Sequence, residues 1–376
     1  MSAFECYAVT HPGLESLTAA ELLALGVVGE VGPGGVSFPA DLGLLCAANL
    51  HLRTASRVLV RVGSFAARTF PELERHAGRL PWDLYLGRGA AVAFRVTSRK
   101  SRLYHQNAIA ERLLTAARNA VGEVAAAKAA ESDADSADAQ LFVVRVVRDQ
   151  VVVSADSSGA LLHRRGYRLA SGKAPLRETL AAGMLLALGW DGSVPLIDPF
   201  CGSGTIPIEG ALLARRIPPG ISRQFQFEGW TGFDAEILEG VRAAARAQVL
   251  PGPPREIVGA DRDAGAIESA GANAERAAVG ADVEFRRAAL SALEPPAGPG
   301  LLLTNPPYGV RVGERLRLRD LYAQLGNIAR RQLEGWEIAL LTSRAGLERQ
   351  AAVPFRTIFE TSNGGLPVRL VAARLE

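Results

Sequence analysis

From about residue 167 onward, short apolar runs alternate with amphipathic helical segments, and this alternation constrains the fold more than any other feature. Apolar runs occur at 194–200 (VPLIDPF), 255–263 (REIVGADRD) and 301–309 (LLLTNPPYG), with helical segments such as 205–216 and 264–279 between them. Strands that alternate with amphipathic helices are typical of a parallel sheet covered on both faces. We therefore predict an α/β, doubly wound domain over residues 167–376.

The string Ile197–Thr205 (IDPFCGSGT) joins a predicted strand directly to a predicted helix through Gly202, Ser203 and Gly204. Glycine tolerates positive φ and has no side chain to keep a ligand away from the backbone. A lone Gly-X-Gly would fit an ordinary strand–helix turn, but the full string is much more specific. It predicts a ligand site at the start of this helix.

A carboxylate at the end of the next strand is the usual partner of such a loop, because it can bind the hydroxyls of a ribose. Asp261 is the choice over Glu228 or Asp234, since only Asp261 follows an apolar strand and precedes a helix. Its distance from the loop exceeds the usual offset of about 20 residues. Residues 223–254 therefore read as an insertion with its own helix, and Asp263 is expected to cap the helix after Asp261.

The length and the composition of the chain limit the remaining possibilities. A chain of 376 residues favours two or three domains, and a hydrophobic content of 48% is ample for their cores. No apolar run approaches a membrane span, and the N-terminus lacks a signal-peptide pattern. Three scattered cysteines and five histidines without paired spacing argue against disulfides and a metal site, which predicts a cytoplasmic protein that binds no metal.

The N-terminal half is predicted to contain short mixed elements of an α+β fold. Strands are expected at 4–10, 57–65, 91–101 and twice within 141–158, with a hairpin at 28–38. Helices are expected at 14–26, 69–80 and 107–119. Residues 122–140, rich in Ala, Ser and Asp, are expected to run from a helix end into a surface loop.

Basic residues concentrate in parts of this half although the net charge of the whole chain is only +3. Between Arg53 and Arg102 they outnumber acidic residues by roughly three to one. Arg99, Lys100 and Arg102 stand at a strand end beside a helix, a suitable place for phosphate contacts. A second cluster runs from His163 to Arg168. Each cluster by itself could equally be a solvated arginine-rich surface.

With these motifs identified, the chain resembles a known family. IDPFCGSGT, GADRD and TNPPYG resemble the first, second and fourth motifs of S-adenosylmethionine-dependent methyltransferases with a Rossmann-like fold. Residues 174–185 resemble the segment before the first motif in enzymes that act on nucleic-acid amines. The N-terminal half resembles a ferredoxin-like segment (1–54) followed by a THUMP RNA-binding domain (55–166). With FQFEGW (225–230) and SNGGLPVRL (362–370), the whole chain is similar to bacterial RNA guanine-amine methyltransferases of the RlmL/YpsC group.

The resemblance implies S-adenosylmethionine as cofactor, RNA as partner and a set of site residues. The expected cofactor-binding residues are Thr179, Asp198, Phe200, Gly202, Ser203, Gly204, Asp261, Arg262 and Asn305. The expected RNA-binding residues are Arg99, Lys100, Arg102, Arg164 and Arg165. One departure concerns the third motif, where an acid or amide often meets the cofactor adenine, but this chain has Ala288 and Ala289. Adenine recognition is then expected to rest on backbone groups or on another residue.

The catalytic residues that this resemblance implies are Asn305, Pro306, Pro307 and Tyr308. An exocyclic amine of a base is a poor nucleophile, because its lone pair is delocalised into the ring. The Asn305 amide oxygen and the Pro306 carbonyl can accept hydrogen bonds from the two N–H groups of the amine. Pro307 can hold these acceptors rigid, and Tyr308 can stack on the base. The target base must leave its helix to reach them.

Several acceptors remain open, since similar motifs serve adenine amines, guanine amines and protein glutamine side chains. The N-terminal half favours RNA, with the N2 amine of a guanosine in 23S ribosomal RNA as the leading substrate and transfer RNA close behind. Adenine-N6 methylation is an alternative. A different class of function is a non-catalytic RNA-binding assembly factor, against which the intact motifs argue.

Overall fold

The computed structural model describes residues 4–127, 139–168, 176–307, 315–343 and 346–376. The chain divides into two compact units. The N-terminal unit comprises Met1–Thr10, Ala19–Leu162 and Arg223–Ala243, and the C-terminal unit comprises His11–Thr18, His163–Ser222 and Ala244–Glu376. The chain therefore passes between the units more than once. The finer division predicted from the sequence, with limits at residues 54 and 166, stays a prediction.

The described residues of the N-terminal unit form an eight-stranded sheet in the order β2-β3-β1-β4-β8-β7-β5-β6. Its strands are β1 (Phe4–Thr10), β2 (Glu30–Gly32), β3 (Gly35–Ala40), β4 (Ala55–Ala66), β5 (Ala91–Arg99), β6 (Ala125–Ala126), β7 (Gln140–Val147) and β8 (Gln150–Asp156). The predicted hairpin at 28–38 and the two strands within 141–158 are confirmed. The 12-residue strand β4 pairs with β1 and β8, so it continues one sheet through the whole unit.

The helices of this unit are α1 (Glu15–Ala24, which begins in the C-terminal unit), α2 (Leu42–His51), α3 (Phe70–Ala77), α4 (Gln106–Val121) and most of α7 (Ala235–Ala247). Capping side chains set where two of them begin. The Asp41 carboxylate accepts a hydrogen bond from Leu44 N at 2.8 Å at the start of α2, and Thr69 accepts one from Glu72 N at the start of α3. Helix α7 is the helix expected within the insertion.

The described residues of the C-terminal unit form a seven-stranded sheet in the order β11-β10-β9-β12-β13-β15-β14. The strands are β9 (Leu196–Asp198), β10 (Ile257–Asp261), β11 (Glu284–Arg287), β12 (Leu301–Thr304), β13 (Glu337–Ser343), β14 (Arg356–Asn363) and β15 (Leu366–Arg374). The first five in spatial order are parallel, whereas β15 and β14 run antiparallel to their neighbours. The sheet is therefore mixed. Of its closing hairpin, the strand β14 was missed in the sequence because it lacks a continuous apolar run.

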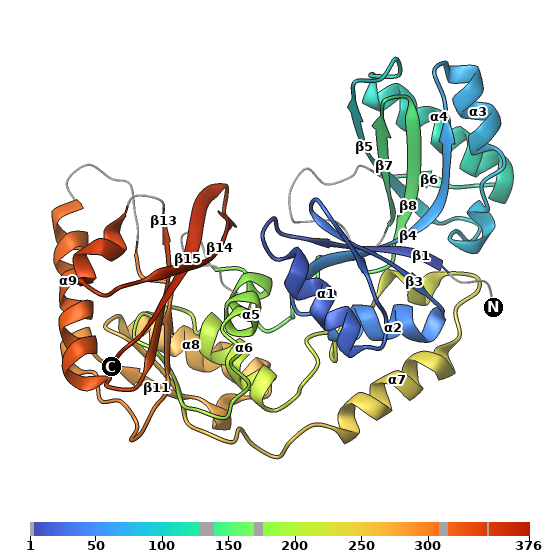
Figure 1. Ribbon diagram of the computed structural model, residues 1–376. Helices are drawn as coiled ribbons and strands as arrows, with labels where there is room; N and C mark the ends of the chain where they lie inside the picture. Colours follow the sequence, from blue (N-terminus) through green and yellow to red (C-terminus); the bar gives the residue numbers. More distant parts are fainter. Residues whose placement is uncertain (1–3, 128–138, 169–175, 308–314, 344–345) are drawn as a thin grey trace. The chain divides into compact units, whose positions relative to one another are not determined.

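Helices cover both faces of this sheet, as Figure 1 shows for α9 on one side and for α5 and α6 on the other. The helices are α5 (Glu178–Ala187), α6 (Thr205–Ala214), α8 (Ala264–Arg276) and α9 (Arg315–Gln332). One apolar cluster joins α5 and α6 to alternate strand residues such as Leu301 and Leu303. A second joins α9 to Leu302 and its neighbours. The doubly wound, Rossmann-like α/β arrangement predicted for this half is confirmed.

The segment His11–Thr18 belongs to the C-terminal unit although it follows the first strand of the chain. Leu14 is fully buried in the cluster that contains Leu180 and Met184 of α5. Gly13, at φ +91°, packs so closely against the Glu360 carbonyl that an added Cβ would lie 2.1 Å from its oxygen. The core of the C-terminal unit thus includes residues from the N-terminal end of the chain. Among the described residues, the helices are too short or too polar to cross a membrane.

Candidate active site

The glycine-rich loop leads from the end of β9 into α6, as the sequence predicted. Gly202 and Gly204 both have positive φ, +52° and +84°. An added Cβ at Gly204 would meet Ala270 and Phe285 at 3.0–3.1 Å, so glycine is needed there for the loop to pack on α8. An added Cβ at Gly202 would meet no atom of the described residues within 4 Å. The Gly202 side of the loop is therefore open for a ligand to approach the backbone.

Asp261 lies beside this loop at the end of β10. Its Oδ2 accepts a hydrogen bond from Gly202 N at 3.1 Å, and its Oδ1 accepts one from Asp263 N at 3.0 Å. A carboxylate offers about four lone-pair positions, so a half-buried Asp261 keeps acceptors for ligand hydroxyls. Asp263 caps α8 by accepting from Gly265 N and Ala266 N, which confirms the predicted cap.

A buried carboxyl group connects the glycine loop to the neighbouring strand. Asp198, the last residue of β9, is 1% exposed, and its Oδ1 accepts hydrogen bonds from Phe200 N at 3.1 Å and from Thr304 Oγ1 at 2.5 Å. Burial raises the pKa of Asp198 to about 7, although these two hydrogen bonds oppose the shift. Because Thr304 ends β12, Asp198 ties the strand of the glycine loop to the strand that carries Asn305.

Asn305 follows β12 directly, and its side-chain oxygen lacks a partner. The Oδ1 atom is buried and accepts no hydrogen bond from any residue that the structure describes. A buried acceptor without a donor costs about 1–3 kcal/mol, so such a group is suited to a ligand that brings an N–H. Pro306 is buried and Pro307 is exposed. Tyr308 lies outside the described residues.

The order of the strands brings these groups to one edge of the sheet. β9, β10 and β12 are adjacent and parallel, so their carboxyl ends carry the glycine loop, Asp261 and Asn305 side by side. The chain runs from β9 outward to β10 and β11, and then returns to place β12 on the other side of β9. Such a reversal is where open α/β sheets bind their ligands.

Two polar residues of α8 that the sequence analysis did not single out hold the glycine-rich loop through hydrogen bonds. Asn273, 2% exposed on α8, donates from Nδ2 to the Ser203 carbonyl at 2.9 Å. Arg276 donates from Nη2 to Asn273 Oδ1 and from Nε to the Tyr167 carbonyl, the latter at 2.7 Å. The only available signal was an Asn and an Arg three positions apart on an alanine-rich helix. Together they form a chain of hydrogen bonds from Tyr167 to the glycine loop.

The remaining predicted cofactor residues lie near this edge in different environments. Thr179 is fully buried in α5, and its Oγ1 makes no hydrogen bond with the described residues. Phe200 is partly buried and packs against the apolar cluster beneath α9. Arg262 is exposed directly after Asp261. Their roles toward the cofactor stay predictions.

The predicted RNA-binding residues fall into two groups. Arg99, Lys100 and Arg102 are exposed in the N-terminal unit, and Arg164 is exposed in the C-terminal unit. Arg165, in contrast, has a side chain only 3% exposed, with its Nε 3.4 Å from Glu209 Oε1. A guanidinium held by a buried carboxylate cannot reach RNA phosphates. We therefore correct the prediction and remove Arg165 from the RNA-binding set.

Comparison with known proteins places this site in a family. The family described as "RMKL-like, methyltransferase domain" matches residues 165–367, and the family described as "RlmL ferredoxin-like domain" matches residues 5–59. The chain belongs to the RMKL-like methyltransferase family. The predicted ferredoxin-like segment at the N-terminus and the predicted resemblance to the RlmL/YpsC group are confirmed.

Curated members of the RMKL-like family match nearly the whole chain. A Synechocystis protein named "Putative RNA methyltransferase slr0064" is 32% identical over 98% of this chain and 96% of its own length. The ribosomal RNA large subunit methyltransferase K/L of Syntrophotalea carbinolica is 36% identical over 97% of this chain. That relative is longer, and the chain spans 53% of it.

Solved structures agree with the fold, and one of them contains a cofactor product. The crystal structure of SMU.472, complexed with SAH (S-adenosylhomocysteine), matches this chain with a TM-score of 0.88 at 29% sequence identity. The match covers 100% of this chain and 99% of that chain. A Listeria monocytogenes protein described as a predicted N6-adenine-specific DNA methylase has a TM-score of 0.85 at 33% identity, with 98% of this chain and 96% of that chain covered. SAH is the product that S-adenosylmethionine leaves after methyl transfer, so the ligand of SMU.472 agrees with the cofactor that the family resemblance implies.

Proposed function

We propose that this RMKL-like methyltransferase transfers a methyl group from S-adenosylmethionine to the exocyclic N2 amine of a guanosine in RNA. The single observation that carries the proposal is the buried Oδ1 of Asn305, which has no hydrogen-bond partner among the described residues. Asn305 lies one residue beyond the end of β12 and beside the strand of the glycine loop. The leading substrate is 23S ribosomal RNA, because relatives that match nearly all of this chain are named as large-subunit ribosomal RNA methyltransferases.

The residues at the carboxyl edge of the sheet fit the cofactor. Asp261 can accept hydrogen bonds from the ribose hydroxyls, and the open side of Gly202 leaves room for the cofactor against the backbone. A cavity of about 220 Å³ nearby is lined by residues that include Ala260, Ala288 and Ala289. We assign the adenine to this small cavity, in which Ala288 and Ala289 stand where an acid or amide is often found at the third motif.

The chemistry required of the protein is to prepare the amine. S-adenosylmethionine, when bound, supplies an electrophilic methyl group on its sulfonium. Asn305 Oδ1 and the Pro306 carbonyl accept hydrogen bonds from the two N–H groups of the amine and so draw the nitrogen lone pair out of the ring. Pro307 restricts the backbone at these acceptors, and Tyr308 stacks on the base after it leaves its helix. The amine becomes acidic once it is methylated, so no strong general base is required.

The test is a methyl-transfer assay on unmodified 23S ribosomal RNA and on transfer RNA, followed by nucleoside analysis. We expect N2-methylguanosine from the ribosomal RNA. Asn305→Ala should lower the rate by roughly 10²–10³, by analogy with the loss of one preorganised polar group. Tyr308→Ala should mainly weaken binding of the base, and Tyr308→Phe should retain most activity because stacking needs the ring rather than the hydroxyl.

The other outcomes of this assay are equally informative. Methyladenosine as the sole product would replace guanine by adenine as the acceptor, and a product found only in transfer RNA would replace the ribosomal substrate. A wild-type rate for Asn305→Ala would refute the mechanism. Binding of S-adenosylmethionine without transfer to any RNA would favour a non-catalytic RNA-binding factor.

A further inference from the structure

The N-terminal unit carries a compact surface that the mechanism does not use. We call it the tip; it consists of the loop between β5 and α4 (residues 99–105) and the turn between β7 and β8 (residues 148–149). Arg148 N donates to the Arg99 carbonyl at 3.2 Å, and Asp149 N donates to Ser101 Oγ at 3.1 Å. Asp149 Oδ1 accepts from Arg102 N at 2.8 Å. These bonds lock the loop and the turn together into one preorganised surface.

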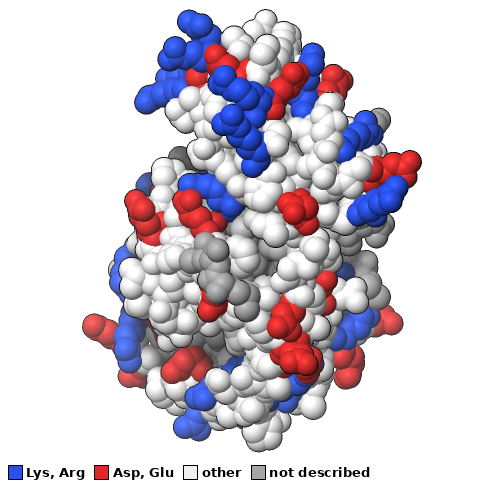
Figure 2. Space-filling model, turned by 90° about the vertical axis from the view of Figure 1, so that its right-hand side faces the viewer, with Lys and Arg blue, Asp and Glu red and all other residues white. Residues whose placement is uncertain are grey.

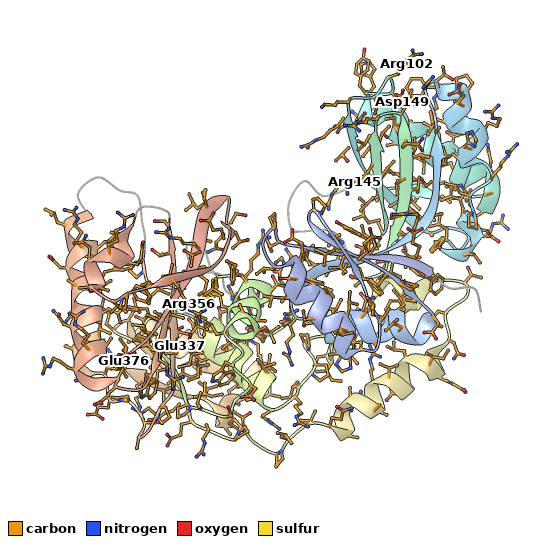
Figure 3. All side chains as sticks on the ribbon, in the orientation of Figure 1. Arg102, Arg145, Asp149, Glu337, Arg356 and Glu376 are labelled. Atoms are coloured by element: carbon orange, nitrogen blue, oxygen red, sulfur yellow. The ribbon has the colours of Figure 1, made fainter. Side chains whose placement is uncertain are left out.

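The charge of the tip is strongly positive. The side chains of Arg99, Lys100, Arg102 and Arg148 are exposed, and within the described residues none of these four side chains makes a hydrogen bond or an ion pair. The acid at the tip, Asp149, is already engaged by the loop backbone and by an arginine of the neighbouring loop. Figure 2 shows Lys and Arg side chains gathered at the top of this unit, and Figure 3 labels Arg102 and Asp149 there.

The N-terminus of α4 adds to this positive potential. Among the described residues its N-cap, His105, makes no side-chain capping bond, and the first turn of the 16-residue helix contains no acid. The first backbone N–H groups of the helix therefore remain available to an anion. Cationic side chains and free helix N–H groups side by side are suited to the phosphates of a nucleic acid.

An exposed aromatic ring stands within this basic surface. Tyr104 is 65% exposed, and it is the one aromatic residue among the exposed large hydrophobic side chains of the described chain. Its neighbour Leu103 is buried, and Ser98 Oγ donates to the Leu103 carbonyl at 2.6 Å, so the backbone at Tyr104 is anchored. The Tyr104 ring already lies against the His105 ring, with centroids 4.1 Å apart. Most of the Tyr104 side chain is thus open to solvent, beside a second aromatic ring.

We infer that the tip binds an unpaired nucleotide of the RNA, with its base stacked on Tyr104 and its flanking phosphates held by Arg99, Lys100, Arg102 and Arg148. Phosphate contacts alone would suit a duplex equally well. A solvent-facing aromatic adds affinity only for a base whose face is exposed, which requires a single-stranded segment. The inference rests on the proposed RNA methyltransferase function, since it specifies which part of the RNA substrate this unit recognises.

The experiment compares two RNAs on the full chain: a single-stranded 12-nucleotide oligomer with a central 2-aminopurine, and the same oligomer paired with its complement. Tyr104→Ala should weaken binding of the single strand roughly 5- to 150-fold, the range for loss of one stacked base, and should abolish the quenching of 2-aminopurine fluorescence. Tyr104→Phe should retain both. Binding of the duplex should change little in either variant. The matched control is Leu23→Ala, which removes an exposed apolar side chain on α1, away from the tip sequence, and should leave all binding unchanged.

Salt titration separates the two components of the site. Lys100→Gln should reduce the slope of log affinity against log salt by about 0.7 for the single strand, whereas Tyr104→Ala should leave the slope intact. Equal losses for single strand and duplex in Tyr104→Ala, or no loss for the single strand, would overturn the inference. If the wild-type chain methylates guanosine in RNA but Tyr104→Ala binds the single strand normally, only this inference is refuted. Absence of methyl transfer by the wild type refutes the proposed function instead.

Discussion

The buried carboxyl of Asp198 should make the stability of the C-terminal unit fall as the pH rises. Its pKa is about 7 in the folded chain against an ordinary value of 3.8. Between pH 3.8 and about pH 7 the folded state therefore keeps a proton that the unfolded state has lost. The free energy of unfolding consequently decreases as the pH rises through this range. A shift of about 3 units corresponds to roughly 4 kcal/mol in total, of which about 2–3 kcal/mol is lost between pH 5 and pH 8.

Asp198→Asn tests this reasoning because the amide keeps an oxygen that can accept from Phe200 N and Thr304 Oγ1 but has no proton to lose. The free energy of unfolding in urea, without cofactor, should be similar for both proteins near pH 5. At pH 8 the variant should be more stable by about 2–3 kcal/mol. The fluorescence of Trp190 and Trp336, both buried in the C-terminal unit, reports the relevant transition. Parallel stability curves from pH 5 to pH 8 would show that Asp198 is not protonated in the folded chain.

Three further predictions concern ligand binding. Asp261→Ala should weaken binding of S-adenosylmethionine in calorimetry by about 1–3 kcal/mol, and unchanged affinity would refute its assignment to the ribose. Asn273→Ala, which leaves the Ser203 carbonyl without its donor, should weaken cofactor binding by about 1 kcal/mol while saturating cofactor restores turnover. Replacing Arg99, Lys100 and Arg102 together by glutamine should lower RNA affinity and flatten its salt dependence without affecting cofactor binding. If RNA binding is normal at every salt concentration, this group is a solvated surface.

The arginines show where sequence reasoning reaches its limit. Arg164 and Arg165 are adjacent and of the same type, so composition treats them alike, yet Arg164 is exposed and Arg165 is paired with buried Glu209. The pairing joins residues 44 positions apart and depends on how the segment before α5 packs on α6. No local pattern distinguishes the two. In contrast, Arg99 and Lys100 were placed correctly at a strand end, because strand periodicity and loop polarity are local properties.

Local sequence patterns were sufficient to locate most of the elements and the functional residues that follow them. The apolar runs before Asp198, Asp261 and Asn305, and the glycines after Asp198, are local signals whose meaning follows from strand, turn and helix preferences. Because the carboxyl ends of adjacent parallel strands meet at one edge, the doubly wound pattern also implied that these residues lie near each other.

The contacts that hold these residues in place depend instead on how the chain packs. The hydrogen bond from Thr304 to Asp198 spans 106 positions, and that from Asn273 to Ser203 spans 70. The raised pKa of Asp198 follows from burial by distant parts of the chain. The side-chain oxygen of Asn305 is buried, and no residue that the structure describes donates a hydrogen bond to it. Burial and hydrogen-bond partners are properties of the packed chain, and they arise from contacts between residues that no short stretch of sequence contains.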